Sequence, residues 1–452
     1  MRPRISIKQG KEMLASHSGL ILIGNLLQAT GLKKQLKTIE GVYCKSPSFS
    51  HADIIFSMAG LISTAKPDYD SIEIFRHKQD FFRSALGISG CPSSATLRQR
   101  VDLIGTKANT TIKLAAANMI KEKAPGLTEV NTLCGTYVPL DIDVSPFDNS
   151  QTKKQGVSRT YKGYDGYALI FAYLGEEGYL VNVEFREGKQ HCQKHTPEFI
   201  NQTLQYTRQI TTKPILMRLD SGNDSVDNFP VIEKFTDVHF IIKRNLRRES
   251  RQAWLDLAKK QGVERYRSAK RTVWIGKTKH DIKGNLLPYP ITFEVSEIWQ
   301  KKGQQLLFPE IEIDTYWCSL QEMEPEQVID LYHDHGTSEQ FHSELKSDMG
   351  LERLPSGYFE SNSLILHLGL LSYNMLRIIG QMSLEHDNSN LPGSRRKKVS
   401  RRRIRTVIQD LMYMAGRLIK TGRKKYISFG QLNPFAPIAG LIEAKLRVPI
   451  PT

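Results

Sequence analysis

The sequence predicts an α/β protein in which a strand-rich core is flanked by a helical N-terminal region and a basic C-terminal region. Its 452 residues are 40% hydrophobic, which is enough for about two to four domains and a sizeable core. Apolar residues recur at helical spacing up to about residue 130. From Tyr137 they occur instead in short β-branched runs that are typical of strands.

Residues 1–130 are expected to form the helical region. Its apolar stretches are Gly19–Leu36, Ala52–Ser63, Ile72–Leu86 and Ile112–Ile120. In Gly87–Val101, Pro92 and the serines after it are suited to start a helix, and Arg98 lies one turn further on. Two short helices joined by a Gly-containing turn fit a helix-turn-helix or, more commonly, a plain helical hairpin.

Residues 131–246 are expected to form the first part of the core. The predicted strands are Tyr137–Val144, Tyr167–Leu174, Tyr179–Phe185, Pro214–Leu219 and Val238–Lys243. One helix is expected at Thr196–Ile210 and a second one before the last strand. Three strands, helix, strand, helix, strand is the element order of the ribonuclease-H-like fold.

Residues 247–320 are expected to interrupt this core as a β-rich insertion. It contains a basic helix, Arg248–Gln261, and three strand-like segments: Thr272–Ile275, Ile291–Trp299 and Ile311–Cys318. The core then resumes over residues 321–385 with two helices, Gln327–Gly350 and Leu364–Ile379. Residues 386–452 form the basic C-terminal region.

The charge balance favours a polyanionic partner. Lys plus Arg total 63 against 47 Asp plus Glu, a net charge of +16. The segment 391–425, with the run Arg395–Arg405, holds 13 Lys or Arg and one acidic residue, so it can neutralise phosphates without reading bases. A solubilising linker is the less favoured interpretation of this segment.

Other features narrow the class of protein. No segment resembles a membrane anchor or a signal peptide. The cysteines are scattered, without a CxxC pair, which suits a reducing cytosol and argues against a disulfide framework or a zinc finger: Cys44, Cys91, Cys134, Cys192 and Cys318. A cytoplasmic location without a membrane partner is therefore expected.

The helix expected at Gln327–Gly350 has two faces. The apolar face should be buried and consists of Val328, Leu331, Phe341 and Leu345. The other face repeats at spacings of three and four and consists of Tyr332, His335, Glu339, His342 and Lys346. A polar face of this kind is usually only solvated, but a carboxylate between phosphate-binding groups could also hold a metal ion beside a nucleic-acid strand.

Three more acidic residues lie in or after predicted strands. Asp141 and Asp143 alternate with apolar residues and so point to the same face. Asp220 ends the strand that begins at Pro214. Carboxylates at strand ends suit Mg²⁺, and three carboxylates from two strands and a helix can hold two ions about 3.5–4 Å apart for phosphodiester displacement.

These residues carry a resemblance to a known family. Tyr332-x2-His335-x3-Glu339-x6-Lys346 resembles the Tyr-Arg-Glu-Lys signature of cut-and-paste insertion-sequence transposases, with His335 in place of Arg. Asp143-x-Ser145 and Asp220-Ser-Gly look like the family's first and second acidic motifs. The chain is most similar to the DDE transposase group 1 family, the "thirteen-eighty" insertion sequences.

The resemblance implies a metal-dependent transposase. Asp143, Asp220 and Glu339 would bind two Mg²⁺ or Mn²⁺ ions and catalyse cleavage at transposon ends followed by strand transfer into target DNA. The partners would be double-stranded DNA and a second copy of the chain in the synaptic complex, in a prokaryotic, nucleoid-associated setting.

The resemblance also implies DNA contacts. Tyr332, His335 and Lys346 would contact phosphates, although histidine cannot offer the two-pronged donor of arginine. A tryptophan of the insertion would stack on a flipped base, with Trp317 the first candidate and Trp299 the second. The further candidate contacts are Arg98 in the N-terminal region and Lys243 and Arg244 along a DNA channel.

Several alternatives remain open. Asp141 could replace Asp143 as the metal ligand, and Glu344 could replace Glu339. The sequence LDIDVS also fits a haloacid-dehalogenase-like phosphohydrolase, in which Asp141 would be the nucleophile and Asp143 the general acid. A catalytically silent, transposase-derived DNA-binding protein is the non-enzyme alternative.

Overall fold

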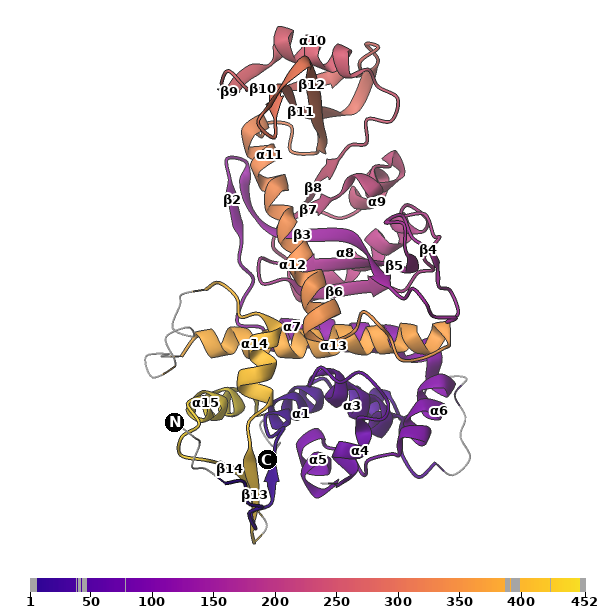
Figure 1. The fold of residues 1–452 in the computed structure, drawn as a ribbon, viewed down its shortest axis with the longest axis vertical. Helices are drawn as coiled ribbons and strands as arrows, with labels where there is room; N and C mark the ends of the chain where they lie inside the picture. The colour runs from indigo at the N-terminus through magenta and orange to yellow at the C-terminus, as the bar shows by residue number, and fades with distance from the viewer. Residues whose placement is uncertain are drawn as a thin grey trace. The chain divides into compact units, whose positions relative to one another are not determined.

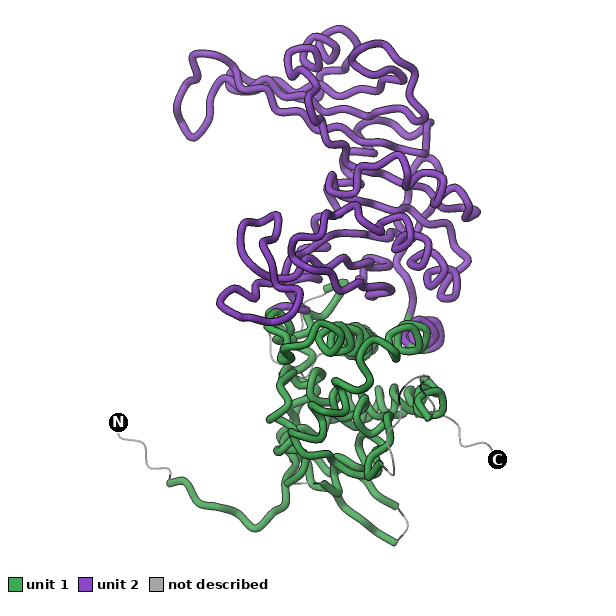
Figure 2. Tube along the Cα trace, turned by 90° about the vertical axis from the view of Figure 1, so that its right-hand side faces the viewer, with its two compact units in different colours: residues 1–115, 123–125, 347–452 green, residues 116–122, 126–346 purple. Residues whose placement is uncertain are grey.

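The computed structural model describes residues 6–37, 39, 42, 47–77, 79–386, 391, 399–422 and 424–447. The chain forms two compact units (Figure 2). Unit 1 comprises residues 1–115, 123–125 and 347–452, and unit 2 comprises residues 116–122 and 126–346. The five segments predicted from the sequence are a different division of the chain, and that division stays a prediction. Cys44 and the first four cations of the basic run, Arg395 to Lys398, lie outside the described residues.

Unit 1 is mainly helical. Its helices are α1 (Leu20–Ala29), α2 (Leu32–Gln35), α3 (His51–Ile62), α4 (Ile72–His77), α5 (Gln79–Leu86), α6 (Ser94–Ile104), α13 (Phe359–Leu384), α14 (Ile404–Val407) and α15 (Ala436–Leu446). A small sheet is formed by β1 (Leu14–Ala15), β13 (Gly416–Thr421) and β14 (Lys424–Phe429). Helix α7 (Asn109–Lys123) contributes residues to both units. The predicted N-terminal helices are therefore present.

Two helices of unit 1 follow directly from their sequences. The side chain of Ser93 caps α6 by accepting a hydrogen bond from the backbone N–H of Thr96, as predicted for this helix start. Helix α13 is apolar on every side and is buried along its length, which is the pattern of a central core helix. By length and composition α13 could also cross a membrane, but its apolar window is fully buried inside the folded chain.

Unit 2 is built on one large sheet (Figure 1). Its first strands are β2 (Val130–Thr132), β3 (Gly135–Asp148), β4 (Ser158–Arg159), β5 (Asp165–Leu174), β6 (Tyr179–Glu184), β7 (Ile215–Leu219) and β8 (Val238–Lys243). Strand β3 lies antiparallel to β5 and parallel to β7, and β7 lies parallel to β8. With α8 (Thr196–Ile210) and α9 (Phe229–Ile232), the predicted order of three strands, helix, strand, helix, strand is present.

The β-rich segment after β8 extends the same sheet. It consists of α10 (Arg251–Gln261), β9 (Val263–Arg267), β10 (Arg271–His280), β11 (Leu286–Lys301) and β12 (Gln304–Cys318). Strand β12 pairs antiparallel with β8, so the sheet continues from the core into this segment without a break. The sequence did not predict β9, because its five residues are all exposed and carry no alternating apolar pattern.

The helix expected at Gln327–Gly350 is present but is not a single α-helix. It begins at Pro325 as α11 (Pro325–His333), passes through a 3₁₀ turn at Asp334–Thr337, and continues as α12 (Ser338–Ser343) into a π turn at Glu344–Asp348. The 3₁₀ turn contains Gly336, which is a poor helix former. All four residues of the predicted apolar face are buried.

The turn between β5 and β6 fixes the position of α12. Gly178 in this turn has a φ of +71°, and a Cβ atom there would lie 2.3 Å from the ring of Phe341 on α12. Neither the backbone conformation nor the contact tolerates a larger residue.

Gly178→Ala should lower the free energy of unfolding by roughly 1–3 kcal/mol through overpacking, in addition to the backbone strain. Gly163→Ala is the matched control, because Gly163 also has a positive φ, +83°, but faces open space. Urea unfolding measures both. Equal losses in the two variants would show that the contact with Phe341 contributes nothing.

Candidate functional site

Two carboxylates meet where strand β7 ends. Strand β3 continues to Asp148, but β7 pairs with it only as far as Ile142 opposite Leu219. Asp143 and Asp220 are the next residues on the two parallel strands and therefore lie side by side. From Asp143 onward, β7 no longer pairs with this edge of β3.

The two carboxylates repel each other. Burial and the negative charge of Asp143 raise the pKa of Asp220 to about 6. The Asn223 amide donates a hydrogen bond to Asp220, which opposes this shift without cancelling it. A pair of adjacent, half-buried carboxylates that repel each other is a place that a cation would stabilise.

Asp143 has a histidine partner. Burial acts to raise the pKa of Asp143, but the hydrogen bond and charge of His342 outweigh it and hold that pKa below its usual range. His342 Nε2 lies 3.0 Å from Asp143 Oδ2, and Nδ1 of the same ring lies 3.1 Å from the Tyr173 hydroxyl. In the neutral ring, Nε2–H donates to Asp143 and Nδ1 accepts from Tyr173.

Asp141 lies in a separate, buried cluster. Arg218 on β7 donates to both oxygens of Asp141 at 2.6 and 2.8 Å, and His335 Nδ1 lies 2.9 Å from the first of them. A third donor of Arg218 bonds the carbonyl of Leu331 on α11. Asp141 is only 2% exposed.

This cluster bears on the two alternative roles of Asp141, as a metal ligand and as the nucleophile of a phosphohydrolase. Burial acts to raise the pKa of Asp141, but the charges of Arg218 and His335 outweigh it and keep that pKa below its usual range. A carboxylate bound through both oxygens and shielded from solvent cannot act as a nucleophile. The phosphohydrolase alternative is therefore disfavoured, and of Asp141 and Asp143 only Asp143 is partly accessible.

The third predicted carboxylate, Glu339, makes no contact with Asp143 or Asp220 in this structure. Glu339 lies on α12, one helical turn after His335 and one before His342, and its side chain is exposed. It makes no hydrogen bond or ion pair within the described part of the chain. Among the described residues no group of three or more His, Cys, Asp or Glu side chains is arranged to hold a metal ion. Glu344, the alternative to Glu339 as the third carboxylate, is buried.

The polar face of this helix is not simply solvated. His335 and His342 are buried against β3, and Lys346 Nζ donates to the carbonyl of Pro146 at 2.7 Å. Tyr332 is half-buried with its ring 4.8 Å from that of Tyr316. In this structure, which holds no DNA, each of the predicted phosphate contacts on the helix has a partner within unit 2, and their role stays a prediction.

The predicted channel cations are also paired. Lys243 Nζ lies 2.7 Å from Asp314, and Arg244 forms an ion pair with Glu249. In unit 1 Arg98 is exposed, with its guanidinium 5.4 Å from the ring centroid of Tyr69. Of these three residues Arg98 presents the most accessible positive charge.

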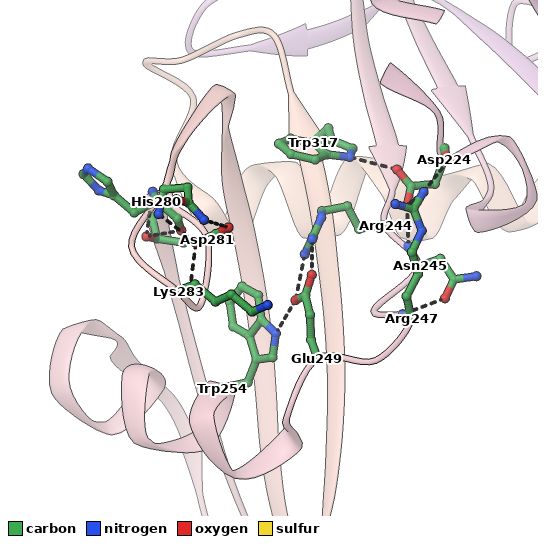
Figure 3. Close-up of polar contacts among 12 residues, drawn as sticks. Asp224, Arg244, Asn245, Arg247, Glu249, Trp254, His280, Asp281, Lys283 and Trp317 are labelled. Atoms are coloured by element: carbon green, nitrogen blue, oxygen red, sulfur yellow. Dashed lines mark hydrogen bonds and ion pairs between the residues drawn. The ribbon is translucent and has the colours of Figure 1, made fainter. Parts of the chain in front are cut away.

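Trp317 is a buried residue whose indole group points towards Asp224 (Figure 3). It is 5% exposed, its indole N–H donates to Asp224 at 2.9 Å, and the Arg244 guanidinium lies 5.1 Å from its ring. This arrangement does not favour base stacking on Trp317. Trp299, at the end of β11, is 39% exposed and lines a cavity of about 560 Å³ together with Trp274.

Sequence reasoning missed the roles of three residues. Arg218 had a usable signal, because an arginine inside the apolar strand Ile215–Leu219 requires a buried carboxylate partner. His342 was placed on the correct helix face but not assigned to Asp143. Tyr161, whose hydroxyl donates to the carbonyl of Val144 at 3.0 Å, gave no signal in the sequence.

Arg218→Met should lower the free energy of unfolding by about 3–5 kcal/mol, because it leaves the Asp141 carboxylate buried without its main partner. Urea unfolding measures the loss. Lys213→Met is the matched control: it breaks the exposed pair with Glu129, 2.8 Å long, and should cost less than about 1 kcal/mol. A loss in Arg218→Met as small as the control's would contradict the assigned role.

Asp220→Asn should stabilise the metal-free protein above pH 6. The pKa of Asp220 is about 6 in the folded chain against about 3.9 unfolded, so wild-type stability falls as pH rises from about 4 to 6 and stays lowered above. The neutral amide of the variant avoids this loss, and we expect a gain of roughly 1–3 kcal/mol at pH 7.5. Thermal unfolding in EDTA measures it. A gain of the same size at pH 4 would rule out charge repulsion as the cause.

Comparison with known proteins places the chain. The transposase DDE domain group 1 family model matches residues 1–448. No curated protein sequence matches the chain significantly. A cryo-electron microscopy structure of a piggyBac transposase synaptic complex with hairpin DNA is similar at a TM-score of 0.42 and 13% identity, over 97% of this chain and 83% of that one. Because the family model spans nearly the whole sequence, this protein belongs to the DDE transposase domain group 1 family.

Proposed function

We propose that this protein is an insertion-sequence transposase of the thirteen-eighty group that cuts DNA at transposon ends and transfers the strands into target DNA in a cut-and-paste reaction. Family membership supplies the class of activity. The observation that carries the site is the adjoining pair Asp143 and Asp220, at the point where β7 stops pairing with β3. Glu339 on the neighbouring helix would complete the acidic triad.

The sheet supports a ribonuclease-H-like core. Its order β6-β5-β3-β7-β8 has three antiparallel strands followed by two strands parallel to β3, with α8 between β6 and β7. Strands β9 to β12 would then be the insertion that precedes the helix with Glu339. This topology places Asp143, which lies inside β3, beside Asp220, which directly follows the end of β7.

The residues present suit divalent cations such as Mg²⁺ or Mn²⁺. Asp143 and Asp220 offer adjacent hard oxygen donors, and a bound cation would oppose the effect of burial and of the Asp143 charge, which together raise the pKa of Asp220. Glu339 is exposed, has no hydrogen bond or ion pair among the residues that the structure describes, and would turn towards the two aspartates. When bound, two ions would activate water or a 3′ hydroxyl and stabilise the leaving oxygen. His342 orients Asp143 for this role through its 3.0 Å hydrogen bond.

The partners would be double-stranded DNA, at terminal repeats and target, and a second copy of the chain. The net charge of +16 suits a polyanion, and joining two transposon ends requires two active sites. Tyr332, His335 and Lys346 lie beside the carboxylates and would exchange their internal partners for phosphates, and Arg98 of α6 would contact the terminal repeat. A cytoplasmic, nucleoid-associated location is part of this proposal.

Asp143→Ala, Asp220→Ala and Glu339→Ala should each reduce strand cleavage of the element's own terminal repeat by at least about 10²-fold while leaving binding of the repeat intact. Cleavage is followed on denaturing gels with Mg²⁺ and Mn²⁺, and binding by gel shift in Ca²⁺. Asp334→Asn is the matched control, an exposed acid five residues before Glu339 on the same helical segment.

A Glu339→Ala protein that still cuts would refute the third assignment. If instead the wild type binds the repeat but never cuts it in either metal, the chain is the catalytically silent DNA-binding alternative.

A further inference from the structure

The free edge of β3 beyond Asp143 is covered by side chains. The carbonyl of Val144 accepts from the Tyr161 hydroxyl at 3.0 Å. The carbonyl of Pro146 accepts from the Tyr164 hydroxyl at 3.0 Å and from Lys346 Nζ at 2.7 Å. Both tyrosines belong to the loop between β3 and β5, which is thereby fastened to the strand that carries Asp143.

Tyr161 presents an aromatic surface beside the carboxylate pair. Its hydroxyl donates a hydrogen bond to the residue that follows Asp143, yet the residue as a whole is 65% exposed. Burial around the hydroxyl and then the negative charges of Asp143 and Asp220 raise the pKa of Tyr161. The hydrogen bond to Val144 therefore places the Tyr161 hydroxyl one residue along β3 from Asp143, on a residue that is exposed overall.

The turn that carries Tyr161 is held in one conformation. Thr160 bonds the carbonyl of Tyr164 through both its backbone N–H and its hydroxyl, at 2.9 and 2.8 Å. Arg159 forms an ion pair with Asp165 and donates a hydrogen bond to the carbonyl of Gly163. Its guanidinium group is therefore bound within the turn. An exposed aromatic ring on an ordered turn loses little conformational freedom when it binds a flat partner.

One charge on this turn remains available. Lys162 follows Tyr161, is exposed, and has no hydrogen-bond or ion-pair partner in the described part of the chain. An aromatic face, a neighbouring free ammonium group and a pair of carboxylates suited to cations together match one nucleotide: a base to stack, a phosphate to neutralise and a phosphodiester to cut.

We infer that Tyr161 and Lys162 form a nucleotide subsite, in which the ring of Tyr161 stacks on the unpaired base next to the scissile phosphate and Lys162 binds the adjoining phosphate. The inference deepens the proposed function and rests on it. The subsite lies on the loop after β3, whereas Trp317 on β12 has its ring buried.

The test is a cycle between one protein change and one DNA change. The substrate is a duplex of the element's own terminal repeat with flanking DNA, carrying an abasic nucleotide at each position around the cleavage point in turn. Cleavage rate and KM are measured for wild type, Tyr161→Ala, Tyr161→Trp and Lys162→Ala. Tyr266→Ala is the matched control, since Tyr266 on β9 is an exposed tyrosine of the same unit.

Tyr161→Ala should lower kcat/KM about tenfold, within the range expected for one stacked base. At a single position the abasic substrate should cost the wild type a similar factor and cost Tyr161→Ala nothing further, whereas Tyr161→Trp keeps most of the activity. Lys162→Ala should raise KM. It should still lose activity with the abasic substrate at that same position, because the ring of Tyr161 is unchanged.

Three results would overturn the subsite. If the wild type cuts and Tyr161→Ala behaves like Tyr266→Ala, the ring has no role. If Tyr161→Ala is impaired but additive with every abasic position, the ring supports the loop and not a base. A wild type that does not cut at all refutes the proposed function, and the subsite fails with it. Thermal midpoints of the variants separate any loss of folding.

Discussion

The buried contact between Arg218 and Asp141 is the interaction on which the site depends. It joins the two parallel strands β3 and β7 at neighbouring positions, and through the carbonyl of Leu331 it also holds helix α11. Taking two charges out of water is costly, and only the two-pronged geometry and the further bond from His335 offset that cost. Because an unpaired charge cannot remain buried there, strands and helix are fixed in one register.

That register places a second pair of side chains, Asp143 and Asp220, two residues further along the chain from Asp141 and Arg218. Asp143 and Asp220 are both acidic, and no arginine lies between them, so they repel. The helical segment that supplies His335 to the first pair supplies a single side-chain partner, His342, to Asp143 of the second pair. One end of the strands is thus rigid and neutralised, and the next residues carry charge that an added cation would relieve.

The break in the helix matters for the third carboxylate. Two short departures from α-helical geometry, at Asp334–Thr337 and Glu344–Asp348, enclose the six residues of α12 that carry Glu339. Irregular turns of this kind are frequent at functional sites because they allow a short segment to change its orientation. Glu339 is exposed between His335 and His342, which are anchored to Asp141 and Asp143 on β3.

The basic residues illustrate where sequence reasoning ends. Their number predicts a polyanionic partner, and the family resemblance assigns some of them to DNA. Lys243, Arg244 and Lys346 nevertheless bind Asp314, Glu249 and the Pro146 carbonyl, whereas Lys162 has no hydrogen-bond or ion-pair partner among the described residues. Which cation is available depends on which acceptor lies across from it in the folded chain.

The sequence by itself determined the local properties: the order of strands and helices in the core, the capped start of α6, the buried stripe of the helix with Glu339 and the shared face of Asp141 and Asp143. These follow from periodicity and backbone preference over a few residues. Only the tertiary structure decided that Asp141 is sealed and Asp143 open, because His335 reaches Asp141 across 194 residues of sequence and no local pattern encodes such a pairing. Burial and partner choice arise from packing between distant segments, and they are what separates a structural carboxylate from one that can hold a metal ion.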